Sequence, residues 1–182
     1  QAGVLGAYAA LFENCIAGGT PVLTDRGWVD IRGVSGADRV WDGEEWVAQG
    51  GCIYSGNRVV LSVYGVEMTP DHQVLTTEGW KSAPSCEGHN RFECRLPDGI
   101  EVRGGRREEV VVGGAGGVRA VYDLLNCGPR NRFVVRGSDG LPLIVHNCCQ
   151  SLAGDVMKAS MPAIEAAGYQ IILTVHDEVL CE

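Results

Sequence analysis

Glycine is concentrated in the middle of this chain, and that distribution restricts the fold more than any other feature. Of the 26 glycines, 22 fall between Cys15 and Asn147, a density of about 17% where ~7% is usual. Glycine and neighbouring Asp and Asn residues mark turns. A segment interrupted this often cannot hold long helices, so we expect short strands joined by tight turns.

The runs between these turns have the composition of strands. They are rich in β-branched and aromatic residues, as in "TPVLT", "GWVDI", "RVVLSVYGV", "HQVLTT", "VRAVYDLL", "RFVVRG" and "LPLIVH". We therefore predict a mostly β domain over residues 15–147. Residues 84–118 are expected to form a short hairpin or two and a Gly-rich connection.

The two ends of the chain differ from the middle in composition and in the spacing of their apolar residues. Residues 4–13 and 150–168 are rich in Ala, Leu, Met and Glu with helical spacing, and residues 169–182 alternate like a strand, a turn and a second strand. If residues 15–147 were absent, the apolar positions of the two helical pieces would share one face. We infer one interrupted helix, with segments 1–14, 15–147 and 148–182, in a fragment of a longer protein.

Charge and apolar content restrict the partners. The net charge of -8 and the pI near 5.0 disfavour direct nucleic-acid binding. No apolar run approaches the roughly 18 to 20 residues of a membrane span. The eight cysteines have irregular spacing and follow no visible signal peptide, so we expect thiols in a cytoplasmic setting. We also expect a monomer that needs no cofactor.

The insert begins and ends at Asn-Cys pairs, and these pairs can do chemistry. Cys15 can attack its own upstream carbonyl through a five-membered ring and convert the Asn14–Cys15 amide to a thioester. Cys148 can then take the acyl group if the fold brings the junctions together. The Asn147 side-chain amide can close a succinimide and break the Asn147–Cys148 bond. A final S-to-N shift would leave a normal peptide bond.

Each of these steps delivers a proton to a leaving nitrogen, which suits an imidazole near neutral pH. His146 lies beside the second junction, and His72 in "TPDHQVLT" is a candidate for the first. At the third Asn-Cys pair, Asn126-Cys127, the composition and the predicted secondary structure do not change. We interpret it as part of a loop before Gly128-Pro129.

The segment from Cys15 to Asn147 resembles an intein. The resemblance rests on five motifs in order: a first-position Cys15, a T-x-x-H block at Thr69–His72, "GWKSA" at Gly79–Ala83, "VYDL" at Val121–Leu124, and "VHN" followed by Cys148. It implies a horseshoe-like HINT β-fold in which both junctions meet at one site. The segment is too short for a homing endonuclease domain, which implies a mini-intein with splicing activity only.

The resemblance also implies a role for each residue of the site. At the first junction Cys15 would be the nucleophile, while Thr69 and His72 would grip and destabilise the scissile amide. Asp123 would steer Cys15 or Cys148 through charge and hydrogen bonding.

At the second junction, Cys148 would be the branch-point nucleophile and His146 would assist cyclisation of Asn147. Hedgehog-like autoprocessing domains share the Cys and T-x-x-H chemistry but transfer the acyl group elsewhere. The terminal Asn147-Cys148 pair argues against that alternative.

The flanks, once joined, are similar to the palm segment of family A DNA polymerases, phage or bacterial, most clearly in "TVHDEV". The resemblance implies a bacterial or phage-infected cell, and a Mg²⁺ at Asp177 in the intact polymerase, with His176 and Glu178 beside it. The partner Asp and the nucleotide-binding helix are missing, so the flanks should have no polymerase activity.

One further interpretation stays open, and a zinc site is also considered. The chain could be an inert polymerase fragment whose β-domain insert serves for binding. Cys86, His89 and Cys94 have the spacing of a zinc half-site, but a second half is lacking, so we expect no metal.

One departure from the intein pattern leads to a prediction. Where the family often has His two residues before a Phe, this chain has Asn131 in "RNRFVV". Asn can hydrogen-bond but cannot transfer a proton at neutral pH, so Asn147 should cyclise more slowly than in a relative with His. Asn131→His should raise the rate of C-terminal cleavage, followed by mass spectrometry. A rate unchanged within twofold would contradict this prediction.

Overall fold

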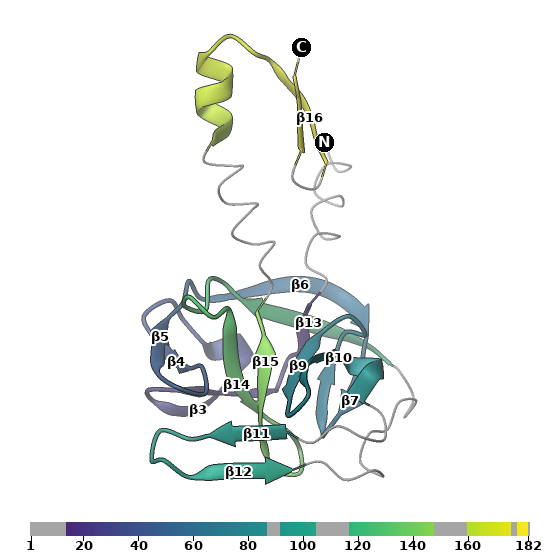
Figure 1. Ribbon diagram of the computed structural model, residues 1–182. Coiled ribbons are helices and arrows are strands. Elements are labelled where there is room, and N and C mark those ends of the chain that lie inside the picture. Colours follow the sequence, from purple (N-terminus) through teal and green to yellow (C-terminus); the bar gives the residue numbers. More distant parts are fainter. Residues whose placement is uncertain (1–13, 87–91, 105–116, 148–159, 176–177, 182) are drawn as a thin grey trace. The chain divides into compact units, whose positions relative to one another are not determined.

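The computed structural model describes residues 14–86, 92–104, 117–147, 160–175 and 178–181 (Figure 1). The chain divides into two compact units, Phe12–Cys148 and the combination of Gln1–Leu11 with Cys149–Glu182. The first unit is built from strands, as predicted. The expected helical stretch 4–13 lies outside the described residues.

In the second unit, residues 160–166 are helical, within the predicted helical stretch. Strands β16 (Ile171–Val175) and β17 (Glu178–Cys181) then pair antiparallel, which confirms the predicted hairpin. Asp177 lies outside the described residues. No helix among the described residues is long and apolar enough to cross a membrane.

One sheet of the first unit holds the start of the predicted insert in its centre. Its order is β6 (Cys52–Val59), β13 (Val118–Leu124), β1 (Ile16–Ala17), β8 (Val66–Met68) and β7 (Leu61–Val63), all antiparallel. Ile16 lies in register with Tyr122 on one side and Met68 on the other. Strand β1 is therefore fixed on both edges directly after Cys15.

A second sheet holds the end of the insert. Its order is β10 (Gly79–Ser82), β9 (Gln73–Thr76), β15 (Pro142–His146), β14 (Arg132–Arg136), β2 (Pro21–Thr24), β4 (Arg39–Trp41) and β5 (Trp46–Ala48), with β3 (Gly27–Asp30) paired to β2. Strand β15 is buried except for its half-buried last residue, His146. The core thus fixes the strand that leads to Asn147.

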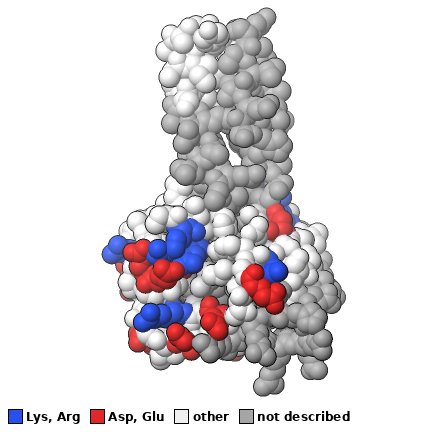
Figure 2. All heavy atoms as spheres, viewed as in Figure 1, with Lys and Arg blue, Asp and Glu red and all other residues white. Residues whose placement is uncertain are grey.

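Three smaller elements complete the first unit. Strands β11 (Phe92–Arg95) and β12 (Glu101–Gly104) form a hairpin, as expected within residues 84–118. The 3-10 helices η1 (Ile31–Gly33) and η2 (Ala83–Cys86) lie between strands. On the face seen in Figure 2, acidic and basic side chains lie next to each other rather than in a patch of one sign.

The run at residues 58–66 is not the single strand that its composition predicts. The chain leaves β6 at Val59, forms β7, and turns at Tyr64 and Gly65 into β8. Both turn residues have positive φ, 49° and 76°, as a two-residue type I′ hairpin requires. The Tyr64 ring is buried and packs on Phe92 with ring centroids 5.1 Å apart. This packing stabilises a turn whose first residue carries no local turn signal.

A substitution at Gly137, which packs against Tyr64, tests how closely this hairpin is packed. A methyl group on Gly137 would overlap the Tyr64 carbonyl and lie 2.8 Å from an Asp139 carboxylate oxygen. Gly137→Ala should therefore lower the free energy of unfolding by about 1 to 3 kcal/mol, the usual cost of overpacking, measured by urea denaturation. The matched control is Gly33→Ala, whose methyl would meet only Val29 at 3.4 Å. Equal stability of the two variants would contradict the close packing.

Candidate active site

Thr69 holds the backbone of the first junction on both sides of Cys15. The Cys15 N–H donates to the Thr69 Oγ1 at 3.0 Å. The Cys15 carbonyl accepts from the Thr69 N–H at 2.9 Å and from its hydroxyl at 3.3 Å. Thr69 is itself buried at the end of β8. The nitrogen of the Asn14–Cys15 amide therefore has a fixed orientation.

His72 is a buried, neutral imidazole next to this amide. Burial lowers its pKa to about 3, and the like charge of His146 acts in the same direction, while the backbone of Asn14 opposes both. Neither ring nitrogen makes a hydrogen bond of standard geometry within the described residues. His72 can therefore accept or donate a proton at neutral pH without first losing an ion-pair partner.

The Cys15 thiol is protonated in this site. Burial raises its pKa to about 12. The negative charges of Asp123 and Asp71 add to the rise, whereas the Ser55 hydroxyl and the Arg58 guanidinium favour the thiolate. Because the thiolate is the nucleophile of cysteine chemistry, Cys15 needs a neighbouring group that takes its proton as it attacks.

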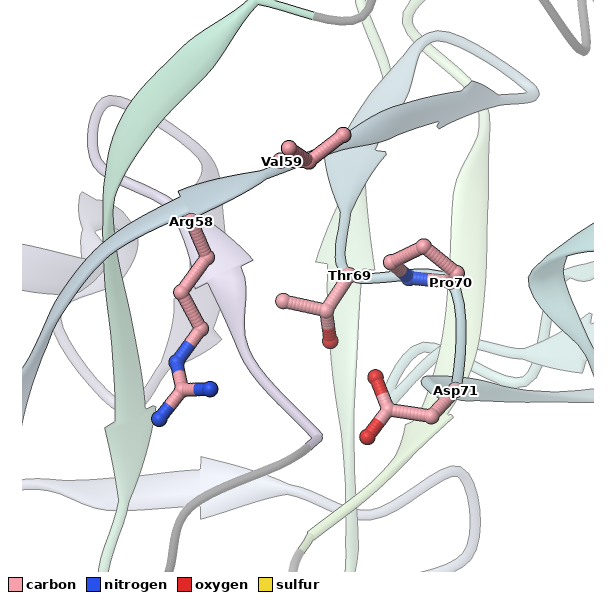
Figure 3. A pocket seen from close by; sticks show the side chains of 5 residues that line it. All are labelled: Arg58, Val59, Thr69, Pro70 and Asp71. Carbon is pink, nitrogen blue, oxygen red and sulfur yellow. The ribbon is translucent and has the colours of Figure 1, made fainter. Parts of the chain in front are cut away.

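An open pocket lies beside the first junction (Figure 3). Arg58 and Val59 of β6 line one side, and Thr69, Pro70 and Asp71 line the other. In Figure 3 the Arg58 guanidinium and the Asp71 carboxylate extend to the same side as the Thr69 hydroxyl. The pocket thus places opposite charges near Thr69, and both charges act on the Cys15 thiol.

Asn147 is buried at the second junction with its side chain fully engaged. Its Nδ2 donates to the Asp123 Oδ1 at 3.0 Å and to the Leu124 carbonyl, and its Oδ1 accepts from the Cys127 N–H at 3.3 Å. Its backbone N–H donates to the Asn131 carbonyl at 2.7 Å. The amide nitrogen must leave Asp123 and Leu124 before it can attack a carbonyl.

His146 provides a second neutral imidazole. It is half-buried, and its ring lies edge-on to Trp80 with centroids 5.1 Å apart. Burial lowers its pKa, and the backbone of Asn147 partly opposes this. Its Nδ1 is buried and makes no hydrogen bond within the described residues. A proton-transfer group therefore lies directly beside Asn147.

Two residues connect the junctions. Asp123 accepts a hydrogen bond from Asn147, and its charge raises the pKa of Cys15. His72 is influenced by the backbone of Asn14 and by His146. The structure thus brings together six of the seven sequence-predicted catalytic residues: Cys15, Thr69, His72, Asp123, His146 and Asn147. Cys148, the seventh, lies outside the described residues.

The turn after β13 contributes contacts that the sequence did not indicate. Asn126-Cys127 does belong to a loop, with Asn126 at a φ of 53°, as expected. However, the backbone of Cys127 binds the Asn147 side chain, and the Asn131 carbonyl binds the Asn147 N–H. Asn131 has a φ of 46°, a conformation in which Asn is enriched. The Asn and Gly residues of "NCGPRN" signal a turn, but not which backbone groups face the site.

The cysteines of the described residues form no disulfide. Those with described side chains are Cys15, Cys52, Cys86, Cys94 and Cys127. Among the described residues, no cluster of three or more His, Cys, Asp or Glu side chains could hold a metal. Cys86 and Cys94 are buried, while His89 lies outside the described residues.

No protein-family model and no curated protein matches this sequence. The structure is similar to solved inteins. A DnaB intein from Synechocystis sp. PCC 6803 matches with a TM-score of 0.54 at 18% identity, over 74% of this chain and 99% of that one. The DnaX mini intein from Spirulina platensis matches with a TM-score of 0.53 at 22% identity, over 73% and 99%.

The AceL NrdHF class 3 split intein matches with a TM-score of 0.57 at 15% identity, over 74% of this chain and 98% of that one. At these identities the shared feature is the fold. The mostly β structure with its curled antiparallel sheets is the HINT fold of inteins, as the sequence motifs predict.

The buried, neutral state of His72 predicts a pH dependence of stability. The unfolded chain binds a proton at this residue below about pH 6.5, but the folded chain does so only near pH 3. The contribution of the neutral His72 to the free energy of unfolding is therefore fully present above pH 6.5. As the pH falls below this value, the free energy of unfolding decreases by about 1.4 kcal/mol per pH unit. His146 acts in the same direction.

Urea unfolding between pH 7 and 4.5 measures this slope before most carboxylates titrate. His72→Gln should reduce the dependence of the unfolding free energy on pH. The smaller dependence that remains comes from His146. An unfolding free energy of the parent chain that stays constant over this range would contradict a neutral His72.

Proposed function

We propose that this chain splices itself, releasing residues 15–147 and joining Asn14 to Cys148. The observation that carries this proposal is that one buried carboxylate, Asp123, binds the Asn147 side chain and also affects the Cys15 thiol. In addition, His72 is close enough to Asn14 and His146 for both to affect its pKa. The ends of an inert binding insert would not need a shared carboxylate and imidazole. The HINT fold supports the same conclusion.

In the first step, the Cys15 sulfur attacks the Asn14 carbonyl and the Asn14–Cys15 amide becomes a thioester. The thiol proton must reach the amide nitrogen as that bond breaks. His72 is suited to this transfer because it is neutral and faces the Asn14 backbone. Thr69 holds the departing nitrogen through its hydroxyl, so positioning and proton transfer come from different residues.

In the second step, the Cys148 thiol attacks the thioester, and the acyl group passes to Cys148 while the Cys15 sulfur takes up a proton. Transfer between two thiols is nearly balanced in energy, so it needs proximity more than a strong base. The effect of Asp123 on both Cys15 and Asn147 supports such proximity. Asn147 immediately precedes Cys148 in the chain.

In the third step, the Asn147 Nδ2 attacks its own carbonyl, loses a proton, and forms a succinimide as the Asn147–Cys148 bond breaks. His146 is suited to take up the Nδ2 proton and deliver one to the leaving nitrogen, because it is adjacent in sequence and its Nδ1 makes no hydrogen bond of standard geometry within the described residues. The released amine of Cys148 then attacks the thioester carbonyl, and the sulfur regains its proton. An ordinary peptide bond joins Asn14 to Cys148.

The flanks serve as the substrate of this reaction. We propose segments 1–14 and 148–182 as parts of a host protein, interrupted by residues 15–147. The "TVHDEV" sequence supports a family A DNA polymerase as the host. The chemistry uses only side chains and backbone of this chain, so no cofactor, nucleic acid or second protein takes part.

Mass spectrometry of the expressed chain tests the proposal. We expect a ligated product of 49 residues and an excised product of 133 residues. Both should disappear in Cys15→Ala, Asn147→Ala and Cys148→Ala, because each variant removes one of the three nucleophiles. Cys86→Ala is the matched control, since it removes a buried thiol outside the site, and it should form both products.

Two other outcomes identify the alternatives. A chain that stays intact under reducing conditions at every pH would favour the inert binding insert. Thiol-dependent release of residues 1–14 without any ligated product would favour hedgehog-like autoprocessing.

A further inference from the structure

The turn formed by residues 126–131, between β13 and β14, contacts Asn147 at two points. Its Cys127 N–H binds the Asn147 Oδ1, and its Asn131 carbonyl binds the Asn147 N–H. Three of its residues have positive φ: Asn126 at 53°, Gly128 at 58° and Asn131 at 46°. Asn is enriched at such angles among non-glycine residues. The 126–131 turn is also held by contacts outside itself.

One of these contacts is a backbone anchor on β5. The Gly128 N–H donates to the Ala48 carbonyl at 3.2 Å. A side chain on Gly128 would meet the Val47 Cβ at 2.7 Å, so glycine permits the close approach. This anchor fixes the turn next to Cys127, and the Gly128 carbonyl accepts from the Asn131 N–H at 3.3 Å.

The other contact is an ion pair from Arg130. Its Nε donates to the Asp42 Oδ2 at 2.7 Å, and its Nη2 donates to the Glu45 Oε1 at 2.5 Å. Asp42 is fully buried, and its Oδ1 accepts the N–H groups of Glu44 and Glu45 at 2.8 Å each. Burial acts to raise the pKa of Asp42, but Arg130 and the backbone donors outweigh it and lower the pKa. The carboxylate is thus charged and fixed.

We propose that Arg130 is a positioning residue for cleavage at the second junction. Through Asp42 it ties the 126–131 turn to the turn between β4 and β5, and so holds the Asn131 carbonyl and the Cys127 N–H against Asn147. This inference rests on the proposed splicing function. Arg130 itself touches no reacting atom. Its effect passes through the backbone of the turn.

The geometry of the pair requires arginine. A guanidinium binds Asp42 with one nitrogen and Glu45 with another, in a fixed plane. An ammonium group could reach Asp42 but would not hold both carboxylates in this arrangement. Removing the cation leaves a buried carboxylate with only backbone donors, and the turn can then move away from it.

The experiment separates the two junctions. In a Cys15→Ala chain, only cleavage after Asn147 can occur, and its rate is followed by mass spectrometry. Arg130→Met should slow this cleavage at least tenfold, and Arg130→Lys should recover part of the loss. In an Asn147→Ala chain, thiol-induced release of residues 1–14 should stay within twofold for Arg130→Met, because Thr69 and His72 do not depend on the turn.

Arg26 provides a matched control. It binds the buried Asp38 with its Nε at 2.6 Å and its Nη2 at 2.7 Å, an Arg–Asp pair of the same kind that does not contact the 126–131 turn. Arg26→Met should leave cleavage after Asn147 within twofold. The double variant Asp42→Asn with Arg130→Met should be no slower than Arg130→Met alone, because the two residues act as one unit.

Hydrogen exchange gives a readout that does not need cleavage. The backbone N–H groups of Asn147 and Cys127 should exchange at least tenfold faster in Arg130→Met than in the parent or in Arg26→Met. Unchanged exchange, equal slowing at both junctions, or a second-junction rate within twofold of the parent would overturn the proposal. A parent that cleaves at neither junction would overturn the splicing function instead, and exchange would still decide the positioning role.

Discussion

The site is organised around one buried carboxylate. Asp123 lies on β13 with almost no exposure and accepts hydrogen bonds from the Leu124 N–H and the Asn147 Nδ2. A carboxylate in such a place must be hydrogen-bonded to be tolerated. Its charge also raises the pKa of the Cys15 thiol. The same group thus binds the end of the insert and adds to the effect of burial, which keeps the Cys15 thiol protonated.

The sheet topology explains how residues separated by more than 130 positions meet at this carboxylate. Strand β1 lies between β13, which carries Asp123, and β8, which Thr69 directly follows, so Cys15 at the start of β1 is held near both residues. Strand β15 lies inside the other sheet, between β9 and β14. It ends at His146 and so positions His146 and Asn147. The hydrophobic core fixes both strands, so the geometry of the site depends on packing as well as on local hydrogen bonds.

Sequence motifs predicted the residues of this site better than the contacts between them. The order of Cys15, the T-x-x-H block, "VYDL" and "VHN" was sufficient to predict a HINT fold and six residues that the structure brings together. The Tyr64–Gly65 hairpin was missed because its stabilising contact is the distant Phe92. The roles of Cys127 and Asn131 at Asn147 were missed for a related reason. They act through backbone groups, whose direction depends on left-handed turn geometry rather than on side-chain type.

The resting site holds its reactive groups in unreactive forms. The Cys15 thiol keeps its proton, and the Asn147 amide nitrogen is held by Asp123 and Leu124. The two imidazoles are neutral, which is the form that can both accept and donate a proton. Simple titration near neutral pH would change none of these groups strongly. Asp123 binds Asn147, and its charge adds to the effect of burial on the Cys15 pKa, so a movement of Asp123 would affect both junctions. Under the proposed function, the Asn147 amide nitrogen must leave Asp123 and Leu124 before it reacts, so part of the barrier would be conformational.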